Sequence, residues 1–145
     1  MSKHELEEGL LLTPRYDEKG LVPCVTKCVK TGNILMVAYM NELALHKTIE
    51  TGEAHYWSRS RNELWHKGAS SGLVQKIIEM RTDCDQDCIL IIVEIPGEIQ
   101  GSCHTGRAGC FYRSIPVGQS TDGDIHLEMK DAEKVFDPAE LYKKD

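Results

Sequence analysis

The chain has 145 residues, a length typical of one domain with a core of its own. Hydrophobic residues make up 41% and charged residues 28%, a balance that excludes wholesale disorder. The net charge of −6 disfavours a general nucleic-acid binder, whose surface is usually basic. Apolar runs such as Cys88–Val93 are too short to cross a membrane, and the acidic start Met1–Glu8 is unlike a secretory signal peptide.

Apolar runs separated by turn residues predict a β-rich chain with one main helix. Asn41 is a suitable N-cap and Gly52 a suitable end for that amphipathic helix. Small and polar residues at 68–72 and 102–110 indicate loops. The predicted strands are, in chain order, Leu21–Lys30, Ile34–Met40, His55–Ser58, Leu73–Arg81, Cys88–Ile95 and Phe111–Val117.

The composition changes at Gly118, where linker-like polar residues begin. Asp137 and Pro138 then predict the start of a short helix. We expect a domain over residues 1–117 and a polar C-terminal extension over residues 118–145. Because the main helix lies between strand pairs and does not alternate with them, the pattern predicts an α+β fold with a mixed, barrel-like sheet.

Three carboxylates occur at alternate positions, Asp83, Asp85 and Asp87. Like charges repel unless something neutralises them. On a strand they would share one face, with Cys84 on the other, and three oxygen donors suit a hard cation such as Mg²⁺ or Ca²⁺. An EF-hand is excluded because Cys88 stands where that loop needs glycine. A solvated acidic turn is the alternative interpretation.

Two cysteines, Cys103 and Cys110, bracket a glycine-containing loop that also carries His104. Soft thiolates favour Zn²⁺, and two of them supply two ligands. Cys84 is the best candidate for a third thiol, and three protein ligands with one open position is the catalytic arrangement. The alternatives are inert buried thiols or a disulfide between Cys103 and Cys110.

The other three of the six cysteines are assigned to the core. Cys24 and Cys28 share a face of one predicted strand, where they would be about 13 Å apart, too far for one metal or a disulfide. Cys88 begins an apolar strand. Without a secretory signal, metal or catalytic roles outrank structural disulfides for the remaining thiols.

The stretch from His55 to Gly68 mixes aromatic, cationic and hydroxyl side chains. Trp57 or Trp65 could stack on a purine, and the cations could hold phosphates. Taken alone, a core tryptophan and solvated cations are the more ordinary interpretation. The candidate binding residues of the stretch are Trp57, Ser58, Arg59, Ser60, Arg61 and Lys67.

Several motifs follow one another between Leu21 and Arg113. They are the segments 33–41 (NILMVAYMN), 51–60 (TGEAHYWSRS), 64–68 (LWHKG), 71–72 (SG), 81–87 (RTDCDQD), 103–106 (CHTG) and 110–113 (CFYR). In this order they closely resemble the phosphoribosyl-AMP cyclohydrolases of histidine biosynthesis. The extension after Val117 is too short for the fused pyrophosphohydrolase domain of some relatives, so we expect the cyclohydrolase alone.

The resemblance implies a cytoplasmic enzyme, an intertwined homodimer, that opens the adenine ring of the small nucleotide 1-(5-phosphoribosyl)-AMP. No nucleic acid or membrane is expected as a partner. The resemblance implies that Zn²⁺ and Mg²⁺ are the cofactors and that Cys84 comes from the partner subunit. The implied ligands are Asp83, Asp85 and Asp87 for Mg²⁺ and Cys84, Cys103 and Cys110 for Zn²⁺.

Ring opening is a hydrolysis in which water attacks carbon 6 of the purine. We expect Zn²⁺ to lower the pKa of that water to ~7 and His104 or His55 to act as general base and then acid. Lys67 is the third catalytic candidate, and Arg107 joins the arginines of the aromatic stretch in holding phosphates. A zinc-stabilised module that binds a nucleotide or RNA without turnover is the alternative. A redox protein is disfavoured because C-x-x-C is absent.

Overall fold

A four-stranded sheet forms the centre of the computed structural model, which describes residues 1–141. Its strand order is β2-β1-β6-β5, with β1 and β6 parallel and the other neighbours antiparallel. The expected α+β fold with a mixed sheet is confirmed. The barrel-like expectation is wrong, because within residues 1–141 no pairing joins the edge strands β2 and β5. The strands are β1 (Val22–Cys28), β2 (Ile34–Met40), β5 (Lys76–Thr82) and β6 (Ile89–Glu94).

The main helix, α2 (Glu42–Thr51), has the predicted ends. The Asn41 side chain accepts the Ala44 N–H at 2.9 Å, and Gly52 ends the helix in the left-handed region at φ 73°. Ala44 and Leu45 are fully buried and join the strand side chains in one core. At ten residues α2 is the longest helix described, and none in residues 1–141 has the length and apolarity needed to span a bilayer.

A separate hairpin consists of β3 (His55–Ser58) and β4 (Glu63–His66). The predicted strand His55–Ser58 is confirmed, whereas β4 was not predicted. Its pairing sets His55 opposite His66 and Ser58 opposite Glu63. Tyr56 is fully buried in the main core, so the hairpin is fixed to the body of the domain.

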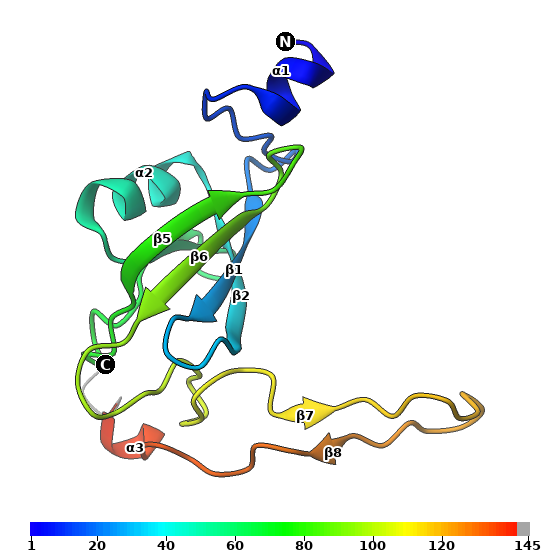
Figure 1. Ribbon diagram of the computed structural model, residues 1–145. Coiled ribbons are helices and arrows are strands. Elements are labelled where there is room, and N and C mark those ends of the chain that lie inside the picture. The colour runs from blue at the N-terminus through cyan, green and yellow to red at the C-terminus, as the bar shows by residue number, and fades with distance from the viewer. Residues whose placement is uncertain (142–145) are drawn as a thin grey trace.

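The N-terminal segment and the arm that carries β7 and β8 lie beyond different ends of the sheet (Figure 1). Helix α1 (Lys3–Glu8), which was not predicted, lies beyond one end. At the other end, β7 (Arg113–Ser114) and β8 (Glu128–Met129) belong to a long arm, so the predicted strand Phe111–Val117 keeps only two residues. The predicted helix after Asp137 is confirmed as α3 (Pro138–Leu141). Residues 142–145 of the predicted extension lie outside the described residues.

Candidate functional site

Residues 83–88 form an acidic turn between β5 and β6. One carboxylate oxygen from each of Asp83, Asp85 and Asp87 lies within 4.8 Å of the others. The expected reason for this closeness, a shared strand face, is wrong, because β5 ends at Thr82 before the first aspartate. A positive φ of 56° at Gln86 helps reverse the chain and gathers the three side chains instead.

The carboxylates of the acidic turn are unequal. Asp83 Oδ1 accepts the backbone N–H groups of Asp87 and Cys88, both at 3.0 Å, which closes the turn. Hydrogen bonding to Asp85 and Asp83 raises the pKa of Asp87 to about 6. The pKa of Asp85 is lowered, first by its hydrogen bond with Asp87 and last by the charge of Arg15. Three crowded oxygen donors that share protons suit a hard divalent cation, which would neutralise them.

Gln86 joins the acidic turn to the N-terminal segment. Its side chain is 4% exposed, and its Oε1 accepts the Thr13 N–H at 2.8 Å. Its Nε2 donates to the carbonyls of Leu6 at 3.1 Å and Leu11 at 3.3 Å. Its own carbonyl accepts the Arg15 N–H at 2.7 Å. Sequence analysis gave Gln86 no role, because these partners are more than 70 residues away along the chain.

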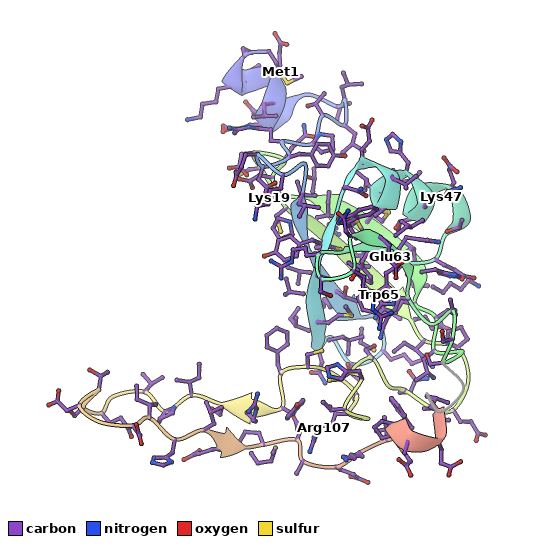
Figure 2. All side chains as sticks on the ribbon, turned by 180° about the vertical axis from the view of Figure 1, so that it is seen from behind. Met1, Lys19, Lys47, Glu63, Trp65 and Arg107 are labelled. Carbon is purple, nitrogen blue, oxygen red and sulfur yellow. The ribbon has the colours of Figure 1, made fainter. Side chains whose placement is uncertain are left out.

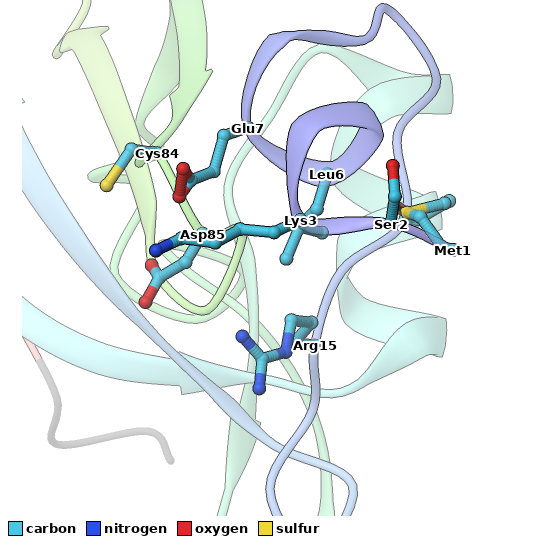
Figure 3. Close-up of a pocket in the computed structure, with 9 residues that line it drawn as sticks. Met1, Ser2, Lys3, Leu6, Glu7, Arg15, Cys84 and Asp85 are labelled. Atoms are coloured by element: carbon cyan, nitrogen blue, oxygen red, sulfur yellow. Dashed lines mark hydrogen bonds between the residues drawn. The ribbon is translucent and has the colours of Figure 1, made fainter.

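A pocket of about 770 Å³ separates the N-terminal segment from the acidic turn. Lys3 extends toward Asp85 across this pocket, and the Arg15 guanidinium points into the same space (Figure 3). Cys84 also lines it and is exposed. The acidic turn therefore has two cations close by while its carboxylates remain open to solvent.

The cysteine loop, residues 102–110, is closed by its own backbone. Ser102 N–H donates to Ala108 O at 3.0 Å, and Cys103 N–H donates to Arg107 O at 3.2 Å. The thiols of Cys103 and Cys110 lie near enough for the charge of one to act on the other, and all six cysteines of the chain are free. The disulfide alternative therefore does not hold. Burial, followed by the charge of Cys103, raises the pKa of Cys110 to about 12.

Lys67 extends from the end of β4 to the cysteine loop. Its side chain is buried, and Nζ donates to Ser102 O at 2.8 Å. Burial lowers the pKa of Lys67, and the charges of Cys110 and Cys103 oppose that shift. Gly68 makes the turn after Lys67 possible, because a Cβ there would lie 2.3 Å from the Val74 nitrogen. The charge of Lys67 acts to lower the pKa of Cys110, against the larger effects of burial and Cys103 that raise it.

Two histidines stack at the start of the β3–β4 hairpin. The rings of His55 and His66 lie 4.4 Å apart and nearly parallel, and His66 Nε2 lies 2.7 Å from Glu53 Oε1. His55 Nδ1 lies 2.9 Å from Glu53 O. Since a carbonyl oxygen only accepts, Nδ1 carries the proton and Nε2 is the basic nitrogen of the neutral His55 ring. His104, the other candidate base, is exposed in the cysteine loop.

The His66–Glu53 pair is absent from the sequence-based candidates. Only the register of β4 opposite β3 brings His66 beside His55, and β4 was not predicted. The motif Leu64–Gly68 marked the segment, but nothing in it indicated the partner Glu53.

The residues expected to bind the substrate do not gather in one place. Arg59, Ser60 and Arg61 are exposed in the hairpin turn, where the Arg59 guanidinium lies 3.9 Å over the Tyr39 ring. Arg107 belongs to the cysteine loop, 4.2 Å over the Tyr112 ring. Its Nε is buried with no hydrogen-bond partner in residues 1–141.

The remaining binding candidates lie on β3. Trp57 and Ser58 are half-buried, and Ser58 Oγ accepts the Arg61 N–H at 3.3 Å. Trp65, on the neighbouring strand, lies on the body of the domain, whereas Arg107 lies near the base of the arm (Figure 2).

The acidic turn and the cysteine loop lie at opposite ends of the sheet (Figure 1). Ile89, which follows the turn, pairs with Cys24 at one end of β1. Cys110 N–H donates to Leu35 O at 2.7 Å, beside the other end of β1. The six residues of β6 between them span roughly 17–20 Å. Cys84 therefore does not meet Cys103 and Cys110 within one chain.

Comparison with known proteins shows that the acidic turn and the cysteine loop both fall within one family match. Residues 36–112, which contain the acidic turn and the cysteine loop, match the family model of phosphoribosyl-AMP cyclohydrolase. The chain belongs to the phosphoribosyl-AMP cyclohydrolase family. Membership makes it an enzyme, a hydrolase of cyclic amidines, so the alternative of a binding module without turnover is set aside.

Three relatives, each a phosphoribosyl-AMP cyclohydrolase by name, cover nearly the whole chain. The protein of Bradyrhizobium diazoefficiens is 55% identical over 97% of this chain and 96% of its own length. That of Nitrobacter winogradskyi is also 55% identical, over 98% of this chain and 94% of its own length. That of Rhodopseudomonas palustris is 53% identical over 96% of this chain and 92% of its own length. The similarity therefore extends through the C-terminal arm as well as the sheet.

Proposed function

We propose that this chain opens the adenine ring of 1-(5-phosphoribosyl)-AMP by hydrolysis, a step of histidine biosynthesis. The observation that carries the proposal is the family similarity over nearly the whole chain, which includes both clusters of candidate ligands. A cytoplasmic location is part of the proposal, and the six free thiols agree with a reducing compartment.

Zinc is the metal that suits the cysteine loop. Cys103 and Cys110 are soft donors near each other in one loop, and the positive charge of the buried Lys67 partly opposes the rise in the pKa of Cys110. Two thiolates are too few, and Cys84 of the same chain is out of reach, so we propose that Cys84 of a second copy completes the set. A zinc ion held by three thiolates, with its fourth position open, would supply an activated water.

A homodimer in which two copies intertwine follows from that arrangement. Cys84 is exposed, as a ligand donated to another chain must be. The arm also exposes large apolar side chains, including Val117 at 96% and Ile115 at 68%. Apolar surface of this kind marks protein interfaces. The two copies would each contribute residues to both active sites.

Magnesium is the metal that suits the acidic turn. The three clustered carboxylates supply hard oxygen donors, and their open side leaves room for further ligands. We propose that a Mg²⁺ held by Asp83, Asp85 and Asp87 assists in orienting the phosphates of the substrate.

The reaction adds water to carbon 6 of the purine, after which the bond from carbon 6 to nitrogen 1 breaks. A general base removes the proton of the attacking water and returns it to the departing nitrogen. His55 Nε2 and the His104 ring are the candidates, and Lys67 maintains positive charge at the thiols. The proposed binding residues are Trp57 for the purine ring, Ser58 and Ser60 beside it, and Arg59, Arg61 and Arg107 for the phosphates.

The test is a direct assay of ring opening. Purified protein is incubated with phosphoribosyl-AMP, and the ultraviolet absorbance is followed as the purine opens. We expect turnover that stops after treatment with a zinc chelator and returns on adding Zn²⁺. Absence of turnover in the zinc-loaded protein would refute the proposed substrate, and full turnover without zinc would refute the proposed metal role.

A further inference from the structure

A chain of buried polar side chains connects the central sheet to the cysteine loop. Thr26 Oγ1 lies 2.7 Å from the Tyr56 hydroxyl, and that hydroxyl donates to Gln75 Oε1 at 2.6 Å. Gln75 Nε2 in turn donates to Ser102 Oγ at 3.3 Å. Thr26, Tyr56 and Gln75 are 0% exposed and Ser102 is 3% exposed. The chain ends at the residue directly before Cys103.

The hydrogen bonds of this chain have a defined direction. A tyrosine hydroxyl has one proton, and the carbonyl oxygen of Gln75 can only accept it. The Thr26 hydroxyl is therefore the donor to Tyr56, and the Gln75 amide nitrogen must face Ser102. Each member consequently orients the next, from β1 to the cysteine loop.

A buried glutamine is a costly choice for this position. A polar group without water destabilises a protein unless its hydrogen bonds are made, and an apolar side chain of similar size would fill the space without that risk. Gln75 satisfies both ends of its amide, since Nε2 also lies 3.4 Å from Met36 Sδ. The Gln75 amide therefore orients its hydrogen-bond partners, which an apolar side chain cannot do.

Ser102 is held from three sides. Its hydroxyl accepts from Gln75, its carbonyl accepts the Lys67 ammonium at 2.8 Å, and its N–H donates to Ala108 at 3.0 Å. These contacts fix the peptide group that directly precedes Cys103. Of the three contacts, the Gln75 contact is the one that reaches the sheet core.

We propose that Gln75, oriented by Tyr56, is a positioning residue for the Cys103 thiol, and this inference rests on the zinc site proposed above. Gln75 touches neither thiol and acts through Ser102. It fixes the direction of one sulfur so that the loop offers its two thiolates to a tetrahedral metal without rearrangement. Direct partners of metal ligands commonly change metal affinity 10–100-fold when they are lost, and Gln75 acts one residue further out, so an effect at the lower end of that range is expected.

The test uses Co²⁺ in place of zinc in the full-length protein, because thiolate ligands give Co²⁺ a strong near-ultraviolet band. The variant Gln75→Leu removes both polar ends of the amide at similar volume. We expect it to bind Co²⁺ about tenfold more weakly and to shift the visible bands that report tetrahedral geometry.

The matched control is Thr48→Val. The Thr48 side chain is also buried, at 1% exposure, but within residues 1–141 its hydroxyl bonds only to the backbone of Ala44 and His55. We expect this variant to lower the melting temperature while leaving Co²⁺ affinity and spectrum unchanged. A comparable spectral change in Thr48→Val would overturn the proposal, because loss of stability alone would then explain the effect.

Two further outcomes would overturn the positioning role of Gln75. A folded Gln75→Leu variant with wild-type affinity and spectrum would overturn the positioning role and leave the zinc site intact. If Gln75→Leu does not fold, Tyr56→Phe replaces it, since it leaves Gln75 Oε1 without its donor, and the same comparison applies. A wild-type protein without a thiolate band would overturn both this proposal and the zinc site, whereas the ring-opening assay tests the substrate independently.

Discussion

Individual carboxylates of the acidic turn have different tasks. Asp83 Oδ1 accepts hydrogen bonds from two backbone N–H groups, so Asp83 holds the turn closed. Asp85 has its pKa lowered by its neighbours and by Arg15, so it remains charged. Asp85 is therefore the member whose neutralisation should affect a bound cation most directly and the fold least.

We predict that Asp85→Asn weakens Mg²⁺ binding about tenfold or more, because a charged ligand is lost. Zinc content should remain that of the wild type, because Asp85 is not one of the three proposed thiolate ligands and Asp83 still closes the turn that carries Cys84. Calorimetry with Mg²⁺ and elemental analysis for zinc measure the two effects. Asp124→Asn, in the exposed arm, is the control, and loss of zinc in Asp85→Asn would show that the two metals bind as one coupled site.

The two candidate bases differ in exposure. His55 is buried with Nδ1 held by a carbonyl, whereas His104 is exposed beside Cys103. We predict that His104→Ala slows ring opening about 10²–10⁴-fold while zinc content is maintained. The measurements are the rate constant and the metal content of the same preparation. An unchanged rate would assign the base to His55 instead.

Among the elements, the β5–β6 hairpin has a second function besides pairing strands. Its turn carries the three aspartates and, through Gln86, also holds the N-terminal segment that contains α1. α1 itself has no buried residue, so packing alone does not retain it. The hydrogen bonds of Gln86 are the main described link between α1 and the sheet.

We predict that Gln86→Asn releases the N-terminal segment. Asparagine tolerates the positive φ of this position, but its shorter side chain cannot reach the carbonyls of Leu6 and Leu11. Each lost hydrogen bond contributes about 0.5–1.5 kcal/mol, so local opening should become several-fold more frequent. Limited proteolysis at residues 6–15 measures it, with Gln100→Asn as control. Cleavage at the wild-type rate would show that Gln86 does not retain the segment.

At the scale of the whole molecule, the distance between the acidic turn and the cysteine loop is the decisive feature. A sheet whose ends are roughly 17–20 Å apart cannot bring three thiols from one chain to one ion. A second copy whose acidic turn faces the cysteine loop would bring three thiols together. Because a twofold axis repeats each contact, the dimer would have two such sites.

We predict that Cys84→Ala and Cys110→Ala proteins are each inactive alone and regain activity when mixed and refolded together. In the mixed dimer one site has all three thiols, so an equal mixture should reach about a quarter of wild-type activity. Ring opening and zinc content are measured on the mixture. A mixture as inactive as its components would refute the shared site.

Local sequence determined much of the framework. Asn41 and Gly52 ended the main helix because capping depends on neighbouring residues alone. Apolar runs predicted β1, β2, β3, β5 and β6, because a buried strand needs them whatever its partner is. The residue types of the acidic turn and the cysteine loop also indicated a hard and a soft metal, since ligand chemistry belongs to the side chains themselves.

Only the tertiary structure decided how these pieces are arranged. The aspartates converge through the turn at Gln86 and not on a strand face, and β4 exists because its residues pair with β3. Gln86 and Gln75 gain their roles from partners that lie far away along the chain. Such partners follow from packing and strand register, which a local pattern does not contain.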